Sequence, residues 1–306
     1  MELIKPGTNL DFVGKMKVAF IASLVAIAIS ILSLVFHGGP NLGIDFAGGT
    51  LVQVQFSKET SVNEVRDALG TVDLGNSIIQ RFGYKTNNEY LIKTEKSSSE
   101  VKGLSSSISE ALANQFGQDD FELRRVEVVG PKVGADLRKK GILAMLYAMI
   151  GILIYITLRF ELRYAIGAII ALIHDVTITV GIFSLLGKEF TLPIIAALLT
   201  IIGYSLNDTI VVFDRIRENL KKVRRQSLGN VINSSVNETL SRTVLTSLTT
   251  LIVVASLYFL GGAVIHDFAF ALIVGILIGT YSSIFIASPT ILAWESLWPS
   301  KPKKKG

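Results

Sequence analysis

Six long apolar stretches constrain the fold of this chain more than any other feature of its sequence. Each is close to the about 20 residues that an α-helix needs to cross the hydrocarbon core of a bilayer. A backbone inside lipid must satisfy its own hydrogen bonds, and helices of this length do so. The sequence therefore predicts a polytopic α-helical membrane protein with six transmembrane helices, at residues 18–36, 141–158, 165–186, 190–213, 244–260 and 268–294.

The composition excludes an ordinary water-soluble enzyme. Half of the residues are apolar, only 18% are charged, and the mean hydropathy is +0.51. The absence of cysteine excludes a disulfide framework, a thiolate nucleophile and a Cys-ligated metal site. The net charge of +5 would favour nucleic acid in a soluble domain, but here the basic residues flank apolar spans. We therefore expect membrane lipid, and no nucleic acid, as their partner.

The first apolar stretch is predicted to be a retained anchor rather than a cleaved signal peptide. It starts after 17 residues, is longer than a typical signal-peptide core and lacks a small-x-small cleavage site. Residues 1–36 are then a cytoplasmic N-terminus followed by the first transmembrane helix.

The basic residues in the short connections predict the orientation. If the N-terminus lies inside, sixteen basic residues fall in the cytoplasmic pieces, namely 1–17, 159–164, the loop 214–243 and the tail 295–306. The short outer connections hold only Lys188. Both termini are then predicted to be cytoplasmic. The basic run 138–140 argues the other way, but it follows a loop of about a hundred residues, where the rule is weak.

Residues 37–140 differ from the rest and predict one extracytoplasmic domain. They hold 13 basic and 14 acidic residues. Alternating apolar residues and a Ser-x-x-Glu capping box at Ser61 and Glu64 predict strands and helices in the order βαββαβ. The expected strands are 51–56, 77–82, 90–93 and 122–129, and the expected helices are 61–69 and 101–116. This order predicts a ferredoxin-like α+β fold with both helices on one face. Without a nucleotide loop or metal-ligand spacing, its simplest interpretation is a contact module.

Ionisable residues within the predicted spans are the candidate functional residues, because charge in lipid is costly. Asp208 lies in the inner half of the fourth span, and Arg242 stands at the entrance to the fifth. The ionisation of a buried carboxylate responds both to burial and to the distance of a guanidinium. A movement of Arg242 could therefore make Asp208 hold or release a proton. The alternative is a structural Asp208 that bonds a neighbouring hydroxyl.

Helical spacing predicts where these residues face. Arg242, Thr246 and Thr249 fall at i, i+4 and i+7, so they share one stripe of the fifth span. By the same spacing Tyr204, Ser205 and Asp208 share a face of the fourth. We therefore expect a polar seam between these two spans.

A second polar pair, His174 and Asp175, lies near the middle of the third span. Adjacent residues on a helix point about 100° apart, so we expect that the two side chains do not face one site. A structural role is the favoured interpretation for this pair.

Four motifs resemble those of the SecF branch of the SecD/SecF family of bacterial protein-export membrane proteins, within the resistance-nodulation-division superfamily. The resemblance covers nearly the whole chain, and the run 202–218 is its most specific part. The motifs are GIDFAGGT at 43–50, VGPKVG at 129–134, HDV at 174–176 and IGYSLNDTIVVFDRIRE at 202–218. Ala47 stands where many relatives have Thr or Ser.

The resemblance implies a subunit of the bacterial inner membrane that couples the proton gradient to protein export, without enzymatic activity or cofactor. Its implied partners are SecD, which supplies the other six-helix half, the SecYEG channel, the translocating polypeptide and, as further candidates, YajC and YidC. By position, Asp208 and Arg242 match residues implicated in proton passage, with Asp175, His174, Asn207 and Thr246 as supporting candidates. Two alternatives stay open: a half-unit of a small-molecule or lipid exporter, and a purely structural subunit.

Overall fold

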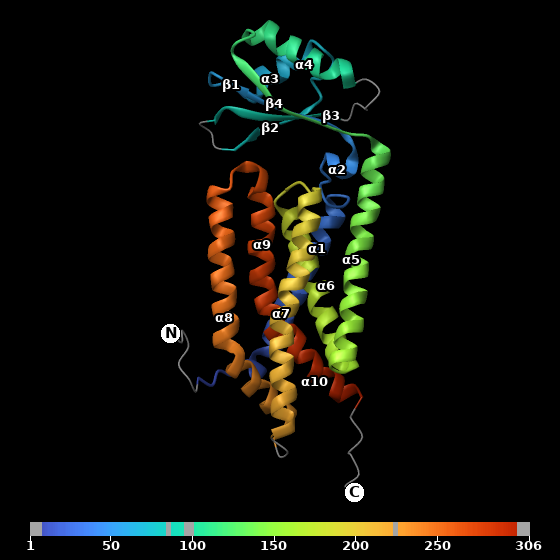
Figure 1. Ribbon diagram of the computed structural model, residues 1–306, viewed down its shortest axis with the longest axis vertical. Helices are drawn as coiled ribbons and strands as arrows, with labels where there is room; N and C mark the ends of the chain where they lie inside the picture. The colour runs from blue at the N-terminus through green and yellow to red at the C-terminus, as the bar shows by residue number, and fades with distance from the viewer. Residues whose placement is uncertain (1–7, 84–86, 95–100, 223–225, 299–306) are drawn as a thin grey trace.

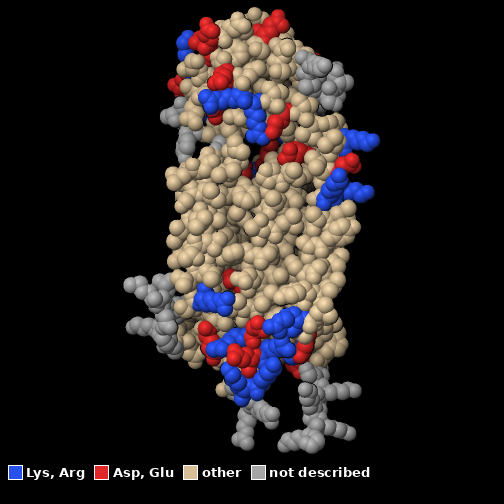
Figure 2. Space-filling model, viewed as in Figure 1, with Lys and Arg blue, Asp and Glu red and all other residues tan. Residues whose placement is uncertain are grey.

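Six helices that are long and apolar enough to cross a membrane stand side by side beneath one α+β domain (Figure 1). The computed structural model describes residues 8–83, 87–94, 101–222 and 226–298. A broad band without charged side chains separates charged residues at the domain end from those at the opposite end (Figure 2). The predicted polytopic fold is confirmed. The spans are α1 (Phe12–Phe36), α5 (Pro131–Arg159), α6 (Leu162–Leu185), α7 (Leu192–Lys222), α8 (Leu228–Leu260) and a sixth at Val264–Leu297.

The six spans are unequally buried. In α6, α7 and the sixth span, 56% of the most apolar window is buried, against 11–17% in α1, α5 and α8. Helices α6 and α7 and the sixth span therefore form the core of the bundle. Helices α1, α5 and α8 expose apolar side chains outward, as expected of a surface that meets lipid or a partner.

The contact between α7 and α9 (Ala263–Ser282) is close because two glycines lie in it. A Cβ added to Gly275 would lie 2.3 Å from Ile201 Cδ1, and one added to Gly279 would lie 2.9 Å from Ser205 Cβ. Small residues four apart let helix backbones approach in lipid. The same contact sets Ser205 and its neighbours on α7 directly against α9.

Most of the predicted connection at 214–243 is helical. α7 continues to Lys222 and α8 begins at Leu228, with Ser227 Oγ accepting a hydrogen bond from the Asn230 amide as its N-cap. Hydropathy detects only the part of a helix that lies in lipid, whereas these extensions are polar. Ion pairs such as Glu218–Lys222 at 3.0 Å support them at i, i+4 spacing.

The sixth span is one continuous crossing with a π-helical turn in its middle. The turn η2 (Ser283–Ala287) joins α9 to α10 (Ser288–Leu297). Pro289 follows the turn in the first turn of α10, and a proline cannot donate the i→i−4 hydrogen bond. Ser288 Oγ donates to the Ser283 carbonyl at 3.0 Å, which satisfies one of the carbonyls in the widened turn.

The domain at the end of the bundle has the predicted βαββαβ order. Its strands form one antiparallel sheet in the order β2-β3-β1-β4, and its two helices cover the face turned away from the bundle (Figure 1). The ferredoxin-like prediction and the Ser61–Glu64 capping box are both confirmed. The elements are β1 (Gly49–Phe56), α3 (Val62–Gly70), β2 (Ile78–Phe82), β3 (Glu89–Thr94), α4 (Val101–Phe116) and β4 (Phe121–Val129).

The domain is joined tightly to α5 through the short helix α2 (Ile44–Ala47) and two glycines. Gly48 has φ 79° and ψ 172°, a conformation that is essentially restricted to glycine. A Cβ there would lie 2.9 Å from Pro131 Cα, and a Cβ on Gly134 would lie 3.0 Å from the Phe46 carbonyl oxygen. Gly48 of the 43–50 motif and Gly134 of the 129–134 motif therefore serve the junction between sheet and membrane helix.

We predict that Gly48→Ala destabilises the protein by about 1–3 kcal/mol, because alanine must adopt the unfavourable backbone conformation and displace Pro131. The thermal unfolding midpoint in detergent measures this loss. Gly103→Ala is the matched control, since a Cβ at Gly103 meets nothing within 4 Å and its helix favours alanine. Equal midpoints for the two variants would contradict the prediction.

Candidate functional site

Asp208 is buried in α7, and a single long hydrogen bond holds it. Its side chain is 3% exposed, and Ser247 Oγ of α8 donates to its Oδ2 at 3.4 Å. Ser247 Oγ and Thr280 Oγ1 of α9 share a hydrogen bond at 2.7 Å. The carboxylate thus lies where three helices meet, and its contact with the surrounding hydroxyls is weak.

The predicted stripe on α8 is wrong by one residue, which is about 100° of rotation. Arg242 and Thr249 are exposed, and Thr246 Oγ1 bonds only carbonyls of its own helix, those of Arg242 and Thr243. The face turned toward α7 carries Ser247 and Thr250 instead, and Thr250 Oγ1 accepts a hydrogen bond from the Tyr204 hydroxyl at 3.3 Å.

Asp175 is the most enclosed carboxylate of the bundle core described here, with no exposed surface. Its Oδ2 accepts hydrogen bonds from Ser205 Oγ of α7 at 2.6 Å and from Ser282 Oγ of α9 at 2.8 Å. Ser205 therefore points to α6 rather than to the expected seam with α8. One carboxylate links the three inner helices.

The expectation that His174 and Asp175 do not share a site is also wrong. His174 Nδ1 lies 2.9 Å from Asp175 Oδ1, although the two residues are adjacent on α6. The ring stacks on Tyr281 with centroids 6.1 Å apart, and the Tyr281 hydroxyl donates to the Ala19 carbonyl of α1 at 2.7 Å. His174 Nε2 is buried without a hydrogen-bond partner among the described residues.

The two carboxylates differ in how firmly they are held. Asp175 has three close polar neighbours, the two serine hydroxyls and the imidazole, whereas Asp208 has one hydroxyl at 3.4 Å. A carboxylate with several short hydrogen bonds is stabilised in one arrangement. The geometry therefore holds Asp175 more firmly in one arrangement than Asp208.

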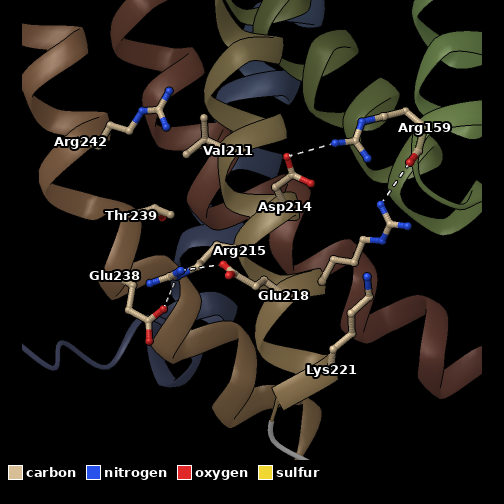
Figure 3. A pocket seen from close by; sticks show the side chains of 10 residues that line it. Arg159, Val211, Asp214, Arg215, Glu218, Lys221, Glu238, Thr239 and Arg242 are labelled. Carbon is tan, nitrogen blue, oxygen red and sulfur yellow. Dashed lines mark hydrogen bonds and ion pairs between the residues drawn. The ribbon is translucent and has the colours of Figure 1, made fainter.

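A cavity of about 610 Å³ opens at the end of the bundle opposite the domain, between α5, α7 and α8 (Figure 3). Arg242 and Val211 line its inner part, and Val211 lies about one helical turn from Asp208. No ion pair joins Arg242 to Asp208 in the part of the chain that the structure describes. The guanidinium instead lies beside the cavity with its side chain exposed.

Most other charged side chains of this cavity are already paired. Arg215 bonds both Glu238 and Glu218, the latter at 2.7 Å, and Arg159 lies 3.9 Å from Asp214 (Figure 3). Like Arg217 and Lys221 of the same cavity, Arg242 forms no ion pair among the described residues.

Of the remaining candidates, Asn207 is exposed on α7 and contributes nothing to the buried contacts at Asp208. Sequence reasoning missed Ser247 and Ser282, which hydrogen-bond the two carboxylates, and Thr280, which hydrogen-bonds Ser247. Serine and threonine are common in membrane helices, so only a partner across the helix contact distinguishes these three. Among the described residues, no group of three or more His, Cys, Asp or Glu side chains could hold a metal ion.

Comparisons with known proteins give the family. The model of the family "Protein export membrane protein SecD/SecF, C-terminal" matches residues 108–297, and that of the "SecD/SecF GG Motif" matches residues 33–60. The chain belongs to the SecD/SecF family. It is 55% identical to the protein translocase subunit SecF of Magnetococcus marinus, over 96% of this chain and 95% of the relative. SecF of Calditerrivibrio nitroreducens is 50% identical over 97% and 98%.

The solved structures agree with this assignment. SecDF from Thermus thermophilus, described as a translocon-associated membrane protein, matches 95% of this chain with a TM-score of 0.83 and 39% identity. The chain spans 39% of that SecDF chain. This SecD/SecF family member is therefore a SecF-type membrane subunit of a protein translocase, and its relatives carry the name of a translocase subunit rather than of an enzyme.

We predict that Asp175→Asn destabilises the protein more than Asp208→Asn. An asparagine at 175 can keep both serine hydrogen bonds at its one oxygen, but its NH2 group then replaces the acceptor that faces His174 Nδ1, and an unsatisfied buried group costs about 1–3 kcal/mol. An asparagine at 208 has one weak contact to lose. Thermal unfolding in detergent measures the difference, with Ser256→Ala as control because Ser256 is exposed and bonds only its own helix. The reverse order of stabilities would contradict this difference between the two carboxylates.

Proposed function

We propose that this chain couples the proton-motive force to protein translocation through a change in the ionisation of Asp208. The observation that carries the proposal is the contrast between the two buried carboxylates of the bundle. Asp175 is held by three neighbours, whereas Asp208 keeps one long hydrogen bond in a setting where charge is costly. A buried acid that is free to change its charge can bias the packing of the helices around it.

The cavity at the end opposite the domain supports a route for protons to this acid. It reaches Val211, about one turn from Asp208, and Arg242 lies beside it. In the proposed cycle, the approach of Arg242 stabilises the charged carboxylate, and its withdrawal favours the protonated form. Each proton that crosses a 100 mV potential supplies about 2.3 kcal/mol, enough to bias a conformational equilibrium about fifty-fold.

The orientation and partners are part of the proposal. Basic and acidic side chains gather together at the end opposite the domain (Figure 2). The sixteen basic residues in the segments expected at that end, against Lys188 alone in the short outer connections, support a cytoplasmic position for it and an outer position for the domain. The chain spans 39% of the solved SecDF, and this supports a SecD partner that supplies a second half. The bacterial inner membrane, the SecYEG channel, the moving polypeptide, YajC and YidC, and anionic lipid at the basic end complete the proposed setting.

We predict that Asp208→Asn abolishes gradient-dependent export. The protein is reconstituted into vesicles with SecD and the channel, a gradient is imposed, and completion of export is measured. Asparagine cannot take up a proton. Gradient-dependent export should therefore fall by up to about fifty-fold for each proton that is no longer coupled, while export without a gradient stays unchanged. Asp208→Glu, which can still titrate, should retain part of the effect.

Asp119→Asn is the matched control, because it makes the same chemical change at an exposed residue of the outer domain, away from the cavity. It should export as the parent does. Arg242→Lys keeps the charge but loses the planar guanidinium, so a partial loss is expected. If Asp208→Asn assembles normally and exports as well as the parent under a gradient, the chain is a structural subunit and the proposal fails.

A further inference from the structure

The N-terminus of α7 is capped by a side chain from outside its own helix. Asp45 Oδ2 of α2 accepts a hydrogen bond from the Leu192 amide at 2.8 Å. Leu192 is the first residue of α7, where backbone amides have no partner within the helix and the helix dipole favours a negative charge. The carboxylate of the 43–50 motif therefore attaches directly to the helix that carries Asp208.

Backbone hydrogen bonds reinforce this attachment. The Phe190 amide donates to the Asn41 carbonyl at 2.6 Å, and the Gly43 amide donates to the Phe190 carbonyl at 2.9 Å. Leu42 and Phe190 form an isolated parallel bridge. The connection between α6 and α7 is thus paired with the segment just before α2, as two short strands would be.

The sheet is attached to the same place by a lysine. Lys93 of β3 donates from Nζ to the Leu42 carbonyl at 3.1 Å and lies 3.4 Å from Glu189 Oε1. Both side chains are mostly buried, with 13% and 23% of their surface exposed, so this pair is less screened than a surface ion pair. We name the joint as residues 41–48, Lys93 and 187–192.

The joint connects the outer domain to Asp208 through one rigid element. Leu192 and Asp208 lie sixteen residues apart in the same helix, a distance of about 24 Å along its axis. At the other side of the joint, Gly48 and Gly134 leave no space for relative sliding of α2 and α5. A displacement of α7 is therefore transmitted to the sheet without an intervening flexible loop.

We propose that Asp45 is a positioning residue that fastens the outer domain to α7, so that a movement started at Asp208 is passed to the domain. This inference rests on the proposed function of Asp208. The role of Asp45 is to accept the Leu192 amide hydrogen bond, and it does not carry protons. Asparagine is as good a cap as aspartate, whereas alanine has no acceptor, so the two substitutions separate fastening from charge.

The first experiment compares Asp45→Ala with Asp45→Asn in vesicles that contain SecD and the channel. Proton flux and gradient-dependent export are measured in the same preparation. Asp45→Ala should lower gradient-dependent export about five-fold, which is the change that corresponds to the loss of one helix cap. Proton flux should stay within about two-fold of the parent. Asp45→Asn should behave as the parent. If Asp45→Asn is as defective as Asp45→Ala, or if proton flux falls together with export, the fastening role is overturned.

The second experiment restores the joint covalently and covers the case in which Asp45→Ala weakens the fold. The chain has no cysteine, and a Cβ on Gly43 would lie 2.7 Å from Thr191 Cγ2, so cysteines at these two positions lie within crosslinking reach. In an Asp45→Ala, Gly43→Cys, Thr191→Cys protein, oxidation should restore gradient-dependent export, and a reductant should remove it again. A crosslink that forms but leaves export unrestored overturns the proposal.

The same preparations separate this inference from the proposed function. Gly43→Cys with Thr191→Cys and an intact Asp45 should export equally well oxidised and reduced, because the joint does not open; arrest on oxidation would overturn the inference. Asp208→Asn is measured in parallel. If Asp208→Asn retains gradient-dependent export, the proposed proton role fails, whereas failure of the joint alone leaves the Asp208→Asn defect in place.

Discussion

The cost of an unpaired polar group in lipid determines how the interior of this bundle is built. Asp175 lies in the centre, and its oxygens meet hydroxyls from α7 and α9 and an imidazole from its own helix. Such contacts require the backbones to lie close together, which Gly275 and Gly279 permit. The position of α7 relative to α9 is therefore fixed by packing and hydrogen bonding at once. Asp208 lies on that same helix, so its surroundings depend on this contact.

Two acids only one helix apart can take opposite roles because their neighbours differ, not because their burial does. Both are at most 3% exposed. Three polar neighbours at short range specify a single arrangement around Asp175, which therefore holds α6, α7 and α9 together. The hydroxyl that reaches Asp208 also bonds Thr280 at 2.7 Å and can keep that bond if the carboxylate changes. A titrating group in a packed bundle needs such an alternative, because otherwise each proton would cost the hydrogen bonds that hold the helices.

The sequence predicted what lipid and local geometry dictate, and it failed where side-chain reach or helix rotation decides. Hydropathy located all six spans, and Ser61 with Glu64 located a helix start, because both signals are local. Hydropathy could not show that 214–243 is largely helical, since that part lies outside the apolar window. The stripe shifted by one residue from Arg242 has the same helical spacing as the predicted one. Spacing alone therefore could not show which stripe of α8 faces α7. His174 meets Asp175 through its rotamer, which spacing does not encode.

The attachments of the outer domain differ in the helix to which each leads. Two are covalent: residues 37–43 lead from α1, and Gly130 alone separates β4 from α5. Both helices lie at the edge of the bundle, where only 11–17% of their apolar windows is buried. The third attachment, at Asp45, is non-covalent and leads to α7 in the core. A chain connected only through α1 and α5 would hold the domain in place without attaching it directly to the N-terminus of the helix that carries Asp208. Under the proposed function, the extra cap on α7 is the contact through which a change at Asp208 reaches the outer domain.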